Sequence, residues 1–104
     1  YYSDFTFGLW NGNQLSPIGK AYFGFDDNEL KVLDKFVRNN TIKKFGPVRE
    51  VEKTFVIEIA FDAVNASNRH KSGVALRFPR IKRLREDKPA SEVIQLSQFK
   101  SEFL

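Results

Sequence analysis

The residues with the greatest potential for chemistry are the cations of one window, residues 67–88. This window holds eight of the seventeen Lys and Arg residues but two of the thirteen acids, so its net charge is +6 while the rest of the chain carries −2. The eight cations are Arg69, Lys71, Arg77, Arg80, Lys82, Arg83, Arg85 and Lys88. Because each phosphate that a cation neutralises releases condensed counterions, such a cluster favours a phosphate-bearing partner.

The alternative interpretation of this window is a solvated edge strand, in which Lys and Arg deter edge-to-edge pairing. Two details favour nucleic acid. Arginine outnumbers lysine in the window by five to three, and its planar guanidinium suits bidentate contacts to phosphate. Phe78 stands between Arg77 and Pro79, where an aromatic ring can stack or wedge against bases.

The chain offers little independent catalytic machinery. It has no phosphate-cradling glycine loop and no Ser/His/Asp spacing, and we expect no metal site, because there is no cysteine and His70 is the one histidine. The carboxylates Glu50, Glu52, Glu58 and Asp62 are scattered, and we interpret them as the solvated face of a strand. We interpret His70 as an exposed, unliganded residue of a polar loop; the alternative is that it adds to a phosphate contact.

The length of 104 residues and a hydrophobic content of 41%, with eleven Phe, predict one globular domain spanning residues 1–104. No apolar run reaches the length that crosses a bilayer, so we expect no membrane partner. The absence of cysteine fits a reducing compartment. The chain begins with Tyr-Tyr and contains no Met, which we interpret as a piece of a longer polypeptide.

Apolar periodicity predicts the first elements. Alternation over residues 4–10 indicates a half-buried strand, and Asn11-Gly12-Asn13 predicts a hairpin turn into a second strand through residues 15–23. Pro17 should mark an edge or a bulge in that second strand. Helical spacing over residues 26–40, opened by an Asp26/Glu29 capping box, predicts a helix that packs its Leu/Phe stripe against the sheet.

Later residues predict two more strands and a last helix. A strand over residues 52–62 should put Phe55, Ile57, Ile59 and Phe61 on one face, and a strand over residues 74–84 is interrupted at Pro79. Ser91 is the expected N-cap of a short C-terminal helix. The predicted class is mainly β with α+β elements: a small Greek-key OB-fold barrel with an inserted helix and a short C-terminal helix.

The basic window also resembles a known family. The run Gly73-Val74-Ala75-Leu76-Arg77-Phe78-Pro79-Arg80, followed by Arg83-Leu84-Arg85-Glu86-Asp87-Lys88-Pro89, is similar to the C-terminal OB domain of ATP-dependent DNA ligases, nearest to the bacterial type. Its "RFPR" and "RxDK" elements occur in that family in this order, the second as nucleotidyltransferase motif VI. The loop at residues 67–73 and the segment 20–30 also resemble the family.

The resemblance implies a catalytic role for motif VI. Arg85 and Lys88 match the cations that approach the β- and γ-phosphates of ATP when the domain closes over an adenylation domain of the same polypeptide. Asp87 would hold those cations or touch the metal-bound pyrophosphate. ATP and Mg²⁺ are thus the cofactors implied for the full-length enzyme, with none expected on this fragment alone, which lacks the K-x-D-G lysine motif and should be inactive.

The resemblance also implies contacts to nicked double-stranded DNA. Arg77 and Phe78 match the pair that presses into the minor groove beside a nick. The cations that would contact backbone phosphates without reading sequence are Arg69, Lys71, Arg80, Lys82 and Arg83. The family usually has a further strand before the position of Asp4, so we expect the barrel to lack a strand or to close differently. A cytoplasmic, nucleoid-associated location is implied.

Two other functions compete with this one. A stand-alone OB module would bind single strands by stacking and a charged groove, and an in-frame upstream K-x-D-G would argue against it. The OB half of an RNA ligase or capping enzyme also uses motif VI cations, although the RFPR element disfavours it.

Overall fold

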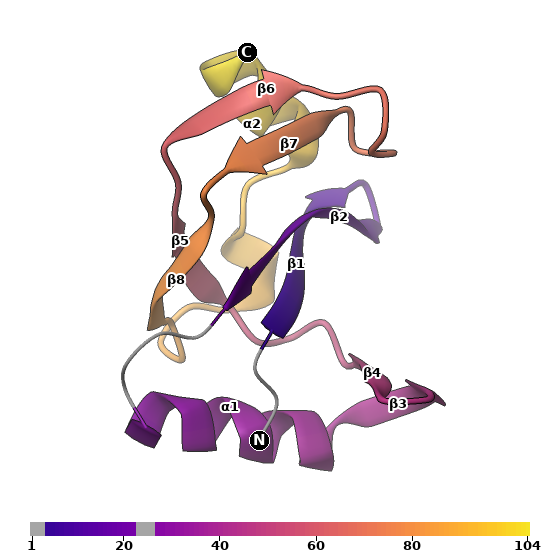
Figure 1. Ribbon diagram of the computed structural model, residues 1–104, viewed down its shortest axis with the longest axis vertical. Helices are drawn as coiled ribbons and strands as arrows, with labels where there is room; N and C mark the ends of the chain where they lie inside the picture. Colours follow the sequence, from indigo (N-terminus) through magenta and orange to yellow (C-terminus); the bar gives the residue numbers. More distant parts are fainter. Residues whose placement is uncertain (1–3, 23–26) are drawn as a thin grey trace.

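The computed structural model describes residues 4–22 and 27–104. Within these residues the chain forms short strands, two α-helices and one 3₁₀ turn (Figure 1). The strands are β1 (Asp4–Asn11), β2 (Gln14–Tyr22), β3 (Thr41–Phe45), β4 (Val48–Val51), β5 (Ile57–Ala60), β6 (Ala63–Ala66), β7 (Val74–Arg77) and β8 (Arg80–Leu84). The helical elements are α1 (Asp27–Asn39), η1 (Ala90–Glu92) and α2 (Leu96–Phe103). The predicted mainly β class, with an inserted helix and a short C-terminal helix, is confirmed.

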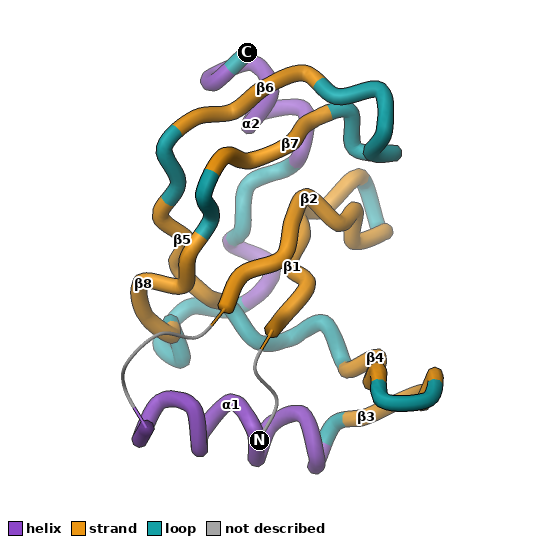
Figure 2. Tube along the Cα trace, viewed as in Figure 1, coloured by secondary structure: helices purple, strands orange, loops and turns teal. Residues whose placement is uncertain are grey.

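The strands pair as antiparallel two-stranded ladders, β1–β2, β3–β4, β5–β8 and β6–β7. β2 lies against both β7 and β8, so three of the ladders gather into one curled group, with α2 beside β1 (Figure 1). The fourth ladder, β3–β4, projects from the end of the molecule where α1 lies (Figure 2). Among the described residues, no ladder joins the group into a closed barrel.

The first hairpin follows the sequence prediction closely. Asn11 pairs with Gln14 across the expected turn, in which Gly12 has a φ of 65°. The register shifts where Phe7 pairs with Gly19 and Gly8 with Pro17, so Ile18 is the extra residue of a bulge. The bulge turns Ile18 into the core, where it is buried, and the expectation of an edge or bulge at Pro17 is confirmed.

One apolar core sits inside the curled group. Its buried members come from both ends of the chain: Phe7, Ile18, Ala21, Val74 and Leu96. Partly buried side chains of β5 and β8, among them Ile57, Ile59 and Ile81, pack against this cluster. The inward position of Ile81 contrasts with Phe78, which is exposed. The core therefore fixes which side of β8 faces solvent.

The expected strand over residues 52–62 is wrong in length, because β5 covers only Ile57–Ala60. Aromatic packing holds both flanks out of the ladder. The Phe55 ring lies 4.9 Å from the Phe36 ring of α1, and the Phe61 ring lies 6.1 Å from the Phe99 ring of α2. These contacts draw the two flanks toward helices at opposite ends of the molecule.

The helix α1 forms where the periodicity predicts it, and Leu33 and Val37 are buried. It contacts the segment before β5 and the end of β8: Phe36 packs on Phe55, and Glu29 Oε2 accepts the N–H of Leu84 at 3.1 Å. A hollow of about 1020 Å³ lies between this helix, the β3–β4 hairpin and the curled strands, so the apolar stripe is not laid flat on a sheet. Asp26 of the expected capping box, like Phe23 and residues 1–3, lies outside the described residues.

The expected N-cap at Ser91 is wrong. After η1 the chain is extended at Val93, and α2 starts at Leu96 with Gln95 in the N-cap position. Contacts to the first hairpin set this late start: Gln95 Oε1 accepts the N–H of Gly12 at 2.9 Å, and the Trp10 indole N–H donates to the Ala90 carbonyl at 2.9 Å. These bonds keep the segment between η1 and Leu96 extended against β1, so α2 begins only at Leu96.

Replacing Gly8 by Ala should destabilise the domain by about 1–3 kcal/mol, because overpacking beside a strand forces backbone shifts. A Cβ at Gly8 would overlap the carbonyl oxygen of Ser16 across the ladder. Urea unfolding followed by circular dichroism measures the loss. Gly12→Asn is the control, since nothing lies within 4 Å of a Cβ there and Asn tolerates positive φ. Equal stability of Gly8→Ala and wild type would contradict the close packing at this bulge.

Candidate nucleic-acid interface

The loop between β6 and β7 is closed by its own hydrogen bonds. The Ser67 N–H donates to the Gly73 carbonyl, and the Gly73 N–H donates to the His70 carbonyl, both at 2.9 Å. Ser67 Oγ lies 2.8 Å from His70 Nδ1. Ser72 is fully buried and donates to the Val74 carbonyl at 3.2 Å. This compact loop leaves the side chains of Arg69, His70 and Lys71 exposed.

The turn between β7 and β8 presents an aromatic ring to solvent. Phe78 has a φ of 53°, the one positive φ at a non-glycine among the described residues, and it is 63% exposed. A bulky residue in this conformation is strained, and such strain concentrates at functional positions. The Arg77 guanidinium lies 5.4 Å from the ring centroid, in cation–π range. Arg80 Nη1 holds the turn by donating to the Phe78 carbonyl at 2.9 Å.

The cations of β8 gather around Glu58 of β5. Glu58 is paired with Arg83 in the ladder, and Glu58 Oε1 lies 3.1 Å from Arg83 Nη2. The register shifts between Glu58 and Ile59, which pairs with Ile81, so Lys82 is the extra residue of a bulge. The bulge brings consecutive cations to one carboxylate, and Lys82 Nζ lies 3.7 Å from Glu58 Oε2.

The turn after β8 carries Arg85, Asp87 and Lys88, the residues expected to form motif VI. The Arg85 N–H donates to the Val56 carbonyl at 2.9 Å, and the Lys88 N–H donates to the Arg85 carbonyl at 3.2 Å. Arg85 forms a forked pair with Asp87, in which Nε–Oδ1 and Nη2–Oδ2 both measure 3.1 Å. Arg85 Nη1 also lies 3.6 Å from Glu58 Oε1. The Arg85 side chain is 28% exposed and that of Asp87 is 71% exposed, so both border solvent.

The pKa values in this cluster follow from its pairs. Desolvation opposes ionisation of Glu58, but the hydrogen bond and charge of Arg83, together with Lys82 and Arg85, outweigh it and hold the Glu58 pKa below its ordinary value of 4.5. The hydrogen bonds from Arg85 and from backbone lower the pKa of Asp87 below 3.8. The same Asp87 contact raises the pKa of Arg85. All three groups are therefore charged at neutral pH.

The structure brings some of the predicted residues together and separates others. Lys82, Arg83 and Arg85 meet around Glu58. The loop carrying Arg69 and Lys71 lies at the far end of β7 from the Phe78 turn, about 13 Å away at the usual strand rise.

Sequence reasoning missed the ion pairs of two acids, Glu58 and Asp62. Glu58 is half-buried rather than a solvated residue, and Asp62 Oδ1 accepts from Arg80 Nη1 at 3.1 Å. The signal that could have found Glu58 is its cross-strand alignment with Arg83, since directly opposed residues of opposite charge attract. That signal needs the β5–β8 register, which spacing along the chain does not give.

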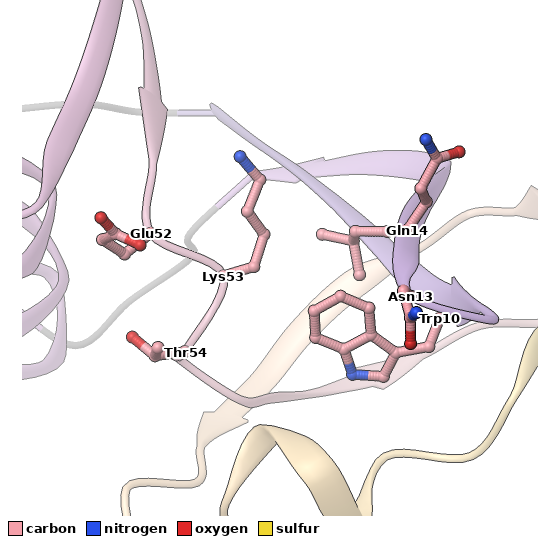
Figure 3. A pocket seen from close by; sticks show the side chains of 7 residues that line it. Trp10, Asn13, Gln14, Glu52, Lys53 and Thr54 are labelled. Carbon is pink, nitrogen blue, oxygen red and sulfur yellow. The ribbon is translucent and has the colours of Figure 1, made fainter.

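A second hollow, of about 560 Å³, lies between the β1–β2 hairpin and residues 52–54 (Figure 3). Trp10, Gln14 and Lys53 border it, and the indole N–H of Trp10 is used by the Ala90 carbonyl. None of the residues predicted to contact DNA or ATP lines this hollow. It is therefore separate from the cationic cluster.

The cluster suits phosphate better than a metal ion. Guanidinium groups at a solvent border fit polyphosphate oxygens, which accept bidentate hydrogen bonds. Among the described residues there is no group of three or more His, Asp or Glu side chains that could hold a metal.

Neither helix in the described part of the chain has the length and apolarity to span a membrane.

Comparison with known proteins defines the family. Residues 1–88 match the family described as "ATP dependent DNA ligase C terminal region", and the chain belongs to this family. It is 50% identical over 96 residues to a "Probable DNA ligase" of Koribacter versatilis, and 44% identical over 98 residues to a "Probable DNA ligase" of Opitutus terrae. A "DNA ligase" of Methanococcoides burtonii is 38% identical over 88 residues.

The matches cover most of this chain but a small part of each relative. They include 92%, 91% and 85% of the chain in the order given. The corresponding shares of the relatives are 17%, 10% and 16%. The chain therefore corresponds to one region of much longer ligases.

The lowered pKa of Glu58 predicts acid sensitivity. A carboxylate with a depressed folded-state pKa stabilises the fold above its ordinary pKa, and this contribution is lost as the pH falls through the folded-state value. The melting temperature of wild type should therefore fall as the pH drops below 4.5, and Glu58→Gln should lose less over that range. Melting curves followed by circular dichroism between pH 7 and pH 3 measure this. Glu50→Gln is the matched control for losing one carboxylate, and parallel curves for wild type and Glu58→Gln would contradict the assignment.

Proposed function

We propose that this chain is the OB-type domain of an ATP-dependent DNA ligase that seals nicks in duplex DNA in the cytoplasm, at the nucleoid. The observation that carries the proposal is the spacing of two features seven residues apart, an exposed aromatic ring and a cation at the solvent border. Phe78 stands out from a strained turn beside Arg77, and Arg85 sits at the solvent border of the following turn. Membership of the ligase family supports the combination.

The DNA-facing half of the proposal rests on Phe78 and the cations near it. An exposed ring on a fixed turn can wedge against a base step in the minor groove, which distorts the duplex locally. Arg77, Arg80, Lys82 and Arg83 would contact backbone phosphates, which position a duplex without reading its sequence. Arg69 and Lys71, one strand length away, would reach phosphates further along the duplex.

The nucleotide-facing half of the proposal rests on the motif VI turn. ATP, when bound with Mg²⁺ in the full-length enzyme, supplies the adenylyl group and the pyrophosphate leaving group. Arg85 and Lys88 would present cationic donors to the β- and γ-phosphates, and Asp87 would orient the Arg85 fork that it binds. The accepting lysine would come from an adenylation domain of the same polypeptide, so this domain contributes charge and positioning.

In the full-length ligase, Arg85→Ala or Lys88→Ala should lower the rate of self-adenylation by roughly 10- to 100-fold, the range expected for charged hydrogen bonds. Sealing of a nick whose 5′ phosphate already carries AMP should change less than about 3-fold, because that step no longer needs the triphosphate. Radiolabel transfer from ATP and gel-based sealing measure the two steps. Lys35→Ala, which removes an exposed cation of α1, is the control. Equal losses in both assays would count against the assignment.

Phe78→Ala should show the reverse pattern, with sealing reduced roughly 10-fold and self-adenylation unchanged, because stacking on a base contributes about 1–3 kcal/mol. Phe78→Gly should also lose sealing while unfolding no more easily than wild type, since glycine relieves the positive-φ strain. Phe45→Ala removes another exposed ring, 51% accessible on the β3–β4 hairpin, and serves as the control. Normal sealing by Phe78→Ala would remove this ring from the DNA site, and tighter binding to single strands than to a nick would favour a stand-alone binder.

A further inference from the structure

Glu58 is the shared partner of three cations. Its Oε1 lies 3.1 Å from Arg83 Nη2 and 3.6 Å from Arg85 Nη1, and its Oε2 lies 3.7 Å from Lys82 Nζ. The Glu58 side chain is 29% exposed, so the cluster borders solvent without being fully screened by it. Because Asp87 also pairs with Arg85, three cations meet two carboxylates here, which leaves a local excess of positive charge.

Backbone geometry, rather than side-chain flexibility, creates this convergence. In a regular strand Lys82 and Arg83 would point to opposite faces. The bulge between Glu58 and Ile59 places both cations beside the carboxylate, and the bond from the Arg85 N–H to the Val56 carbonyl brings in the third. The three cations thus surround a position that suits an anion with two oxygens, and the Glu58 carboxylate occupies that position.

The arrangement around Glu58 resembles the one that a phosphodiester would need. A phosphate and a carboxylate both offer oxygen pairs to a guanidinium fork. Lys82 and Arg83 are more than half exposed, at 67% and 58%, so an incoming phosphate can reach them. Arg85 differs, because Asp87 holds it independently through a fork. Loss of Glu58 as a partner therefore releases Lys82 and Arg83 more completely than Arg85.

We propose, on the basis of the function proposed above, that Glu58 is a positioning residue that occupies Lys82 and Arg83 until duplex phosphates replace it, while keeping Arg85 in place for the triphosphate. The Glu58 carboxylate thereby affects both DNA binding and adenylation. It weakens DNA binding, because it competes with phosphate, and it supports adenylation, because it restrains the Arg85 guanidinium.

The test compares the full-length ligase with its Glu58→Gln variant in two assays. Binding to nicked duplex should tighten about 3-fold at low salt, and the dependence of log Kd on log salt should steepen by about one phosphate contact, because two cations have lost their internal competitor. The rate constant of self-adenylation at saturating ATP should fall about 5-fold with KM for ATP changed less than 2-fold. General damage to the fold would weaken both activities and would not steepen the salt dependence.

Matched variants separate Glu58 from net charge. Glu50→Gln removes one negative charge beside Lys53 on the β3–β4 hairpin and should change neither assay by more than about 1.5-fold. Glu58→Asp keeps the charge on a shorter side chain and should fall between wild type and Glu58→Gln. It also serves as the test variant if Glu58→Gln does not fold.

The outcomes distinguish this inference from the proposed function. If wild type binds nicked duplex without salt dependence, or if Arg85→Ala adenylates normally, the proposed function fails and this inference fails with it. If both of those controls behave as expected but Glu58→Gln matches Glu50→Gln, or binds DNA more weakly than wild type, the inference about Glu58 alone is overturned.

Discussion

The pairing of β5 with β8 is the interaction on which the functional surface depends. Residues that are 20 or more positions apart in the chain become direct neighbours there, with Glu58 opposite Arg83 and Ile59 opposite Ile81. One side of this short ladder packs on the core and the other holds the charged cluster. Because each face is fixed by the other, core packing indirectly sets where the cations lie. A domain with a small core therefore controls charge geometry through strand register.

Much of the framework could be predicted from the sequence, because it is encoded locally. The turn at Asn11-Gly12-Asn13 needs residues that tolerate positive φ, and α1 shows its apolar positions at helical spacing. The break between β7 and β8 follows from Pro79, which cannot donate to a ladder. The basic window could also be predicted, because its charge is read directly from the sequence and does not depend on the fold.

The remaining features depend on contacts between distant segments, which periodicity does not contain. The truncation of β5 comes from Phe55 and Phe61 packing on helices at opposite ends of the molecule. The late start of α2 comes from bonds between Gln95 and the first hairpin. The two strands of the β3–β4 hairpin were not predicted, and their local signal is weak: Gly46, whose φ is 61°, lies in the turn that joins them. The role inferred for Glu58 was hidden for the same reason, because a carboxylate in an alternating strand gives no hint of its cross-strand partner.

The bonds around the turn after β8, residues 85–88, restrict how this turn can move. Ahead of it, the Arg85 N–H is tied to Val56; behind it, the Ala90 carbonyl accepts the indole N–H of Trp10, from the opposite end of the chain. Both anchors belong to the packed body of the domain, so the turn has no hinge of its own. Displacing the turn relative to the strands would require these bonds to break, so the turn and the packed body of the domain move together as a rigid unit.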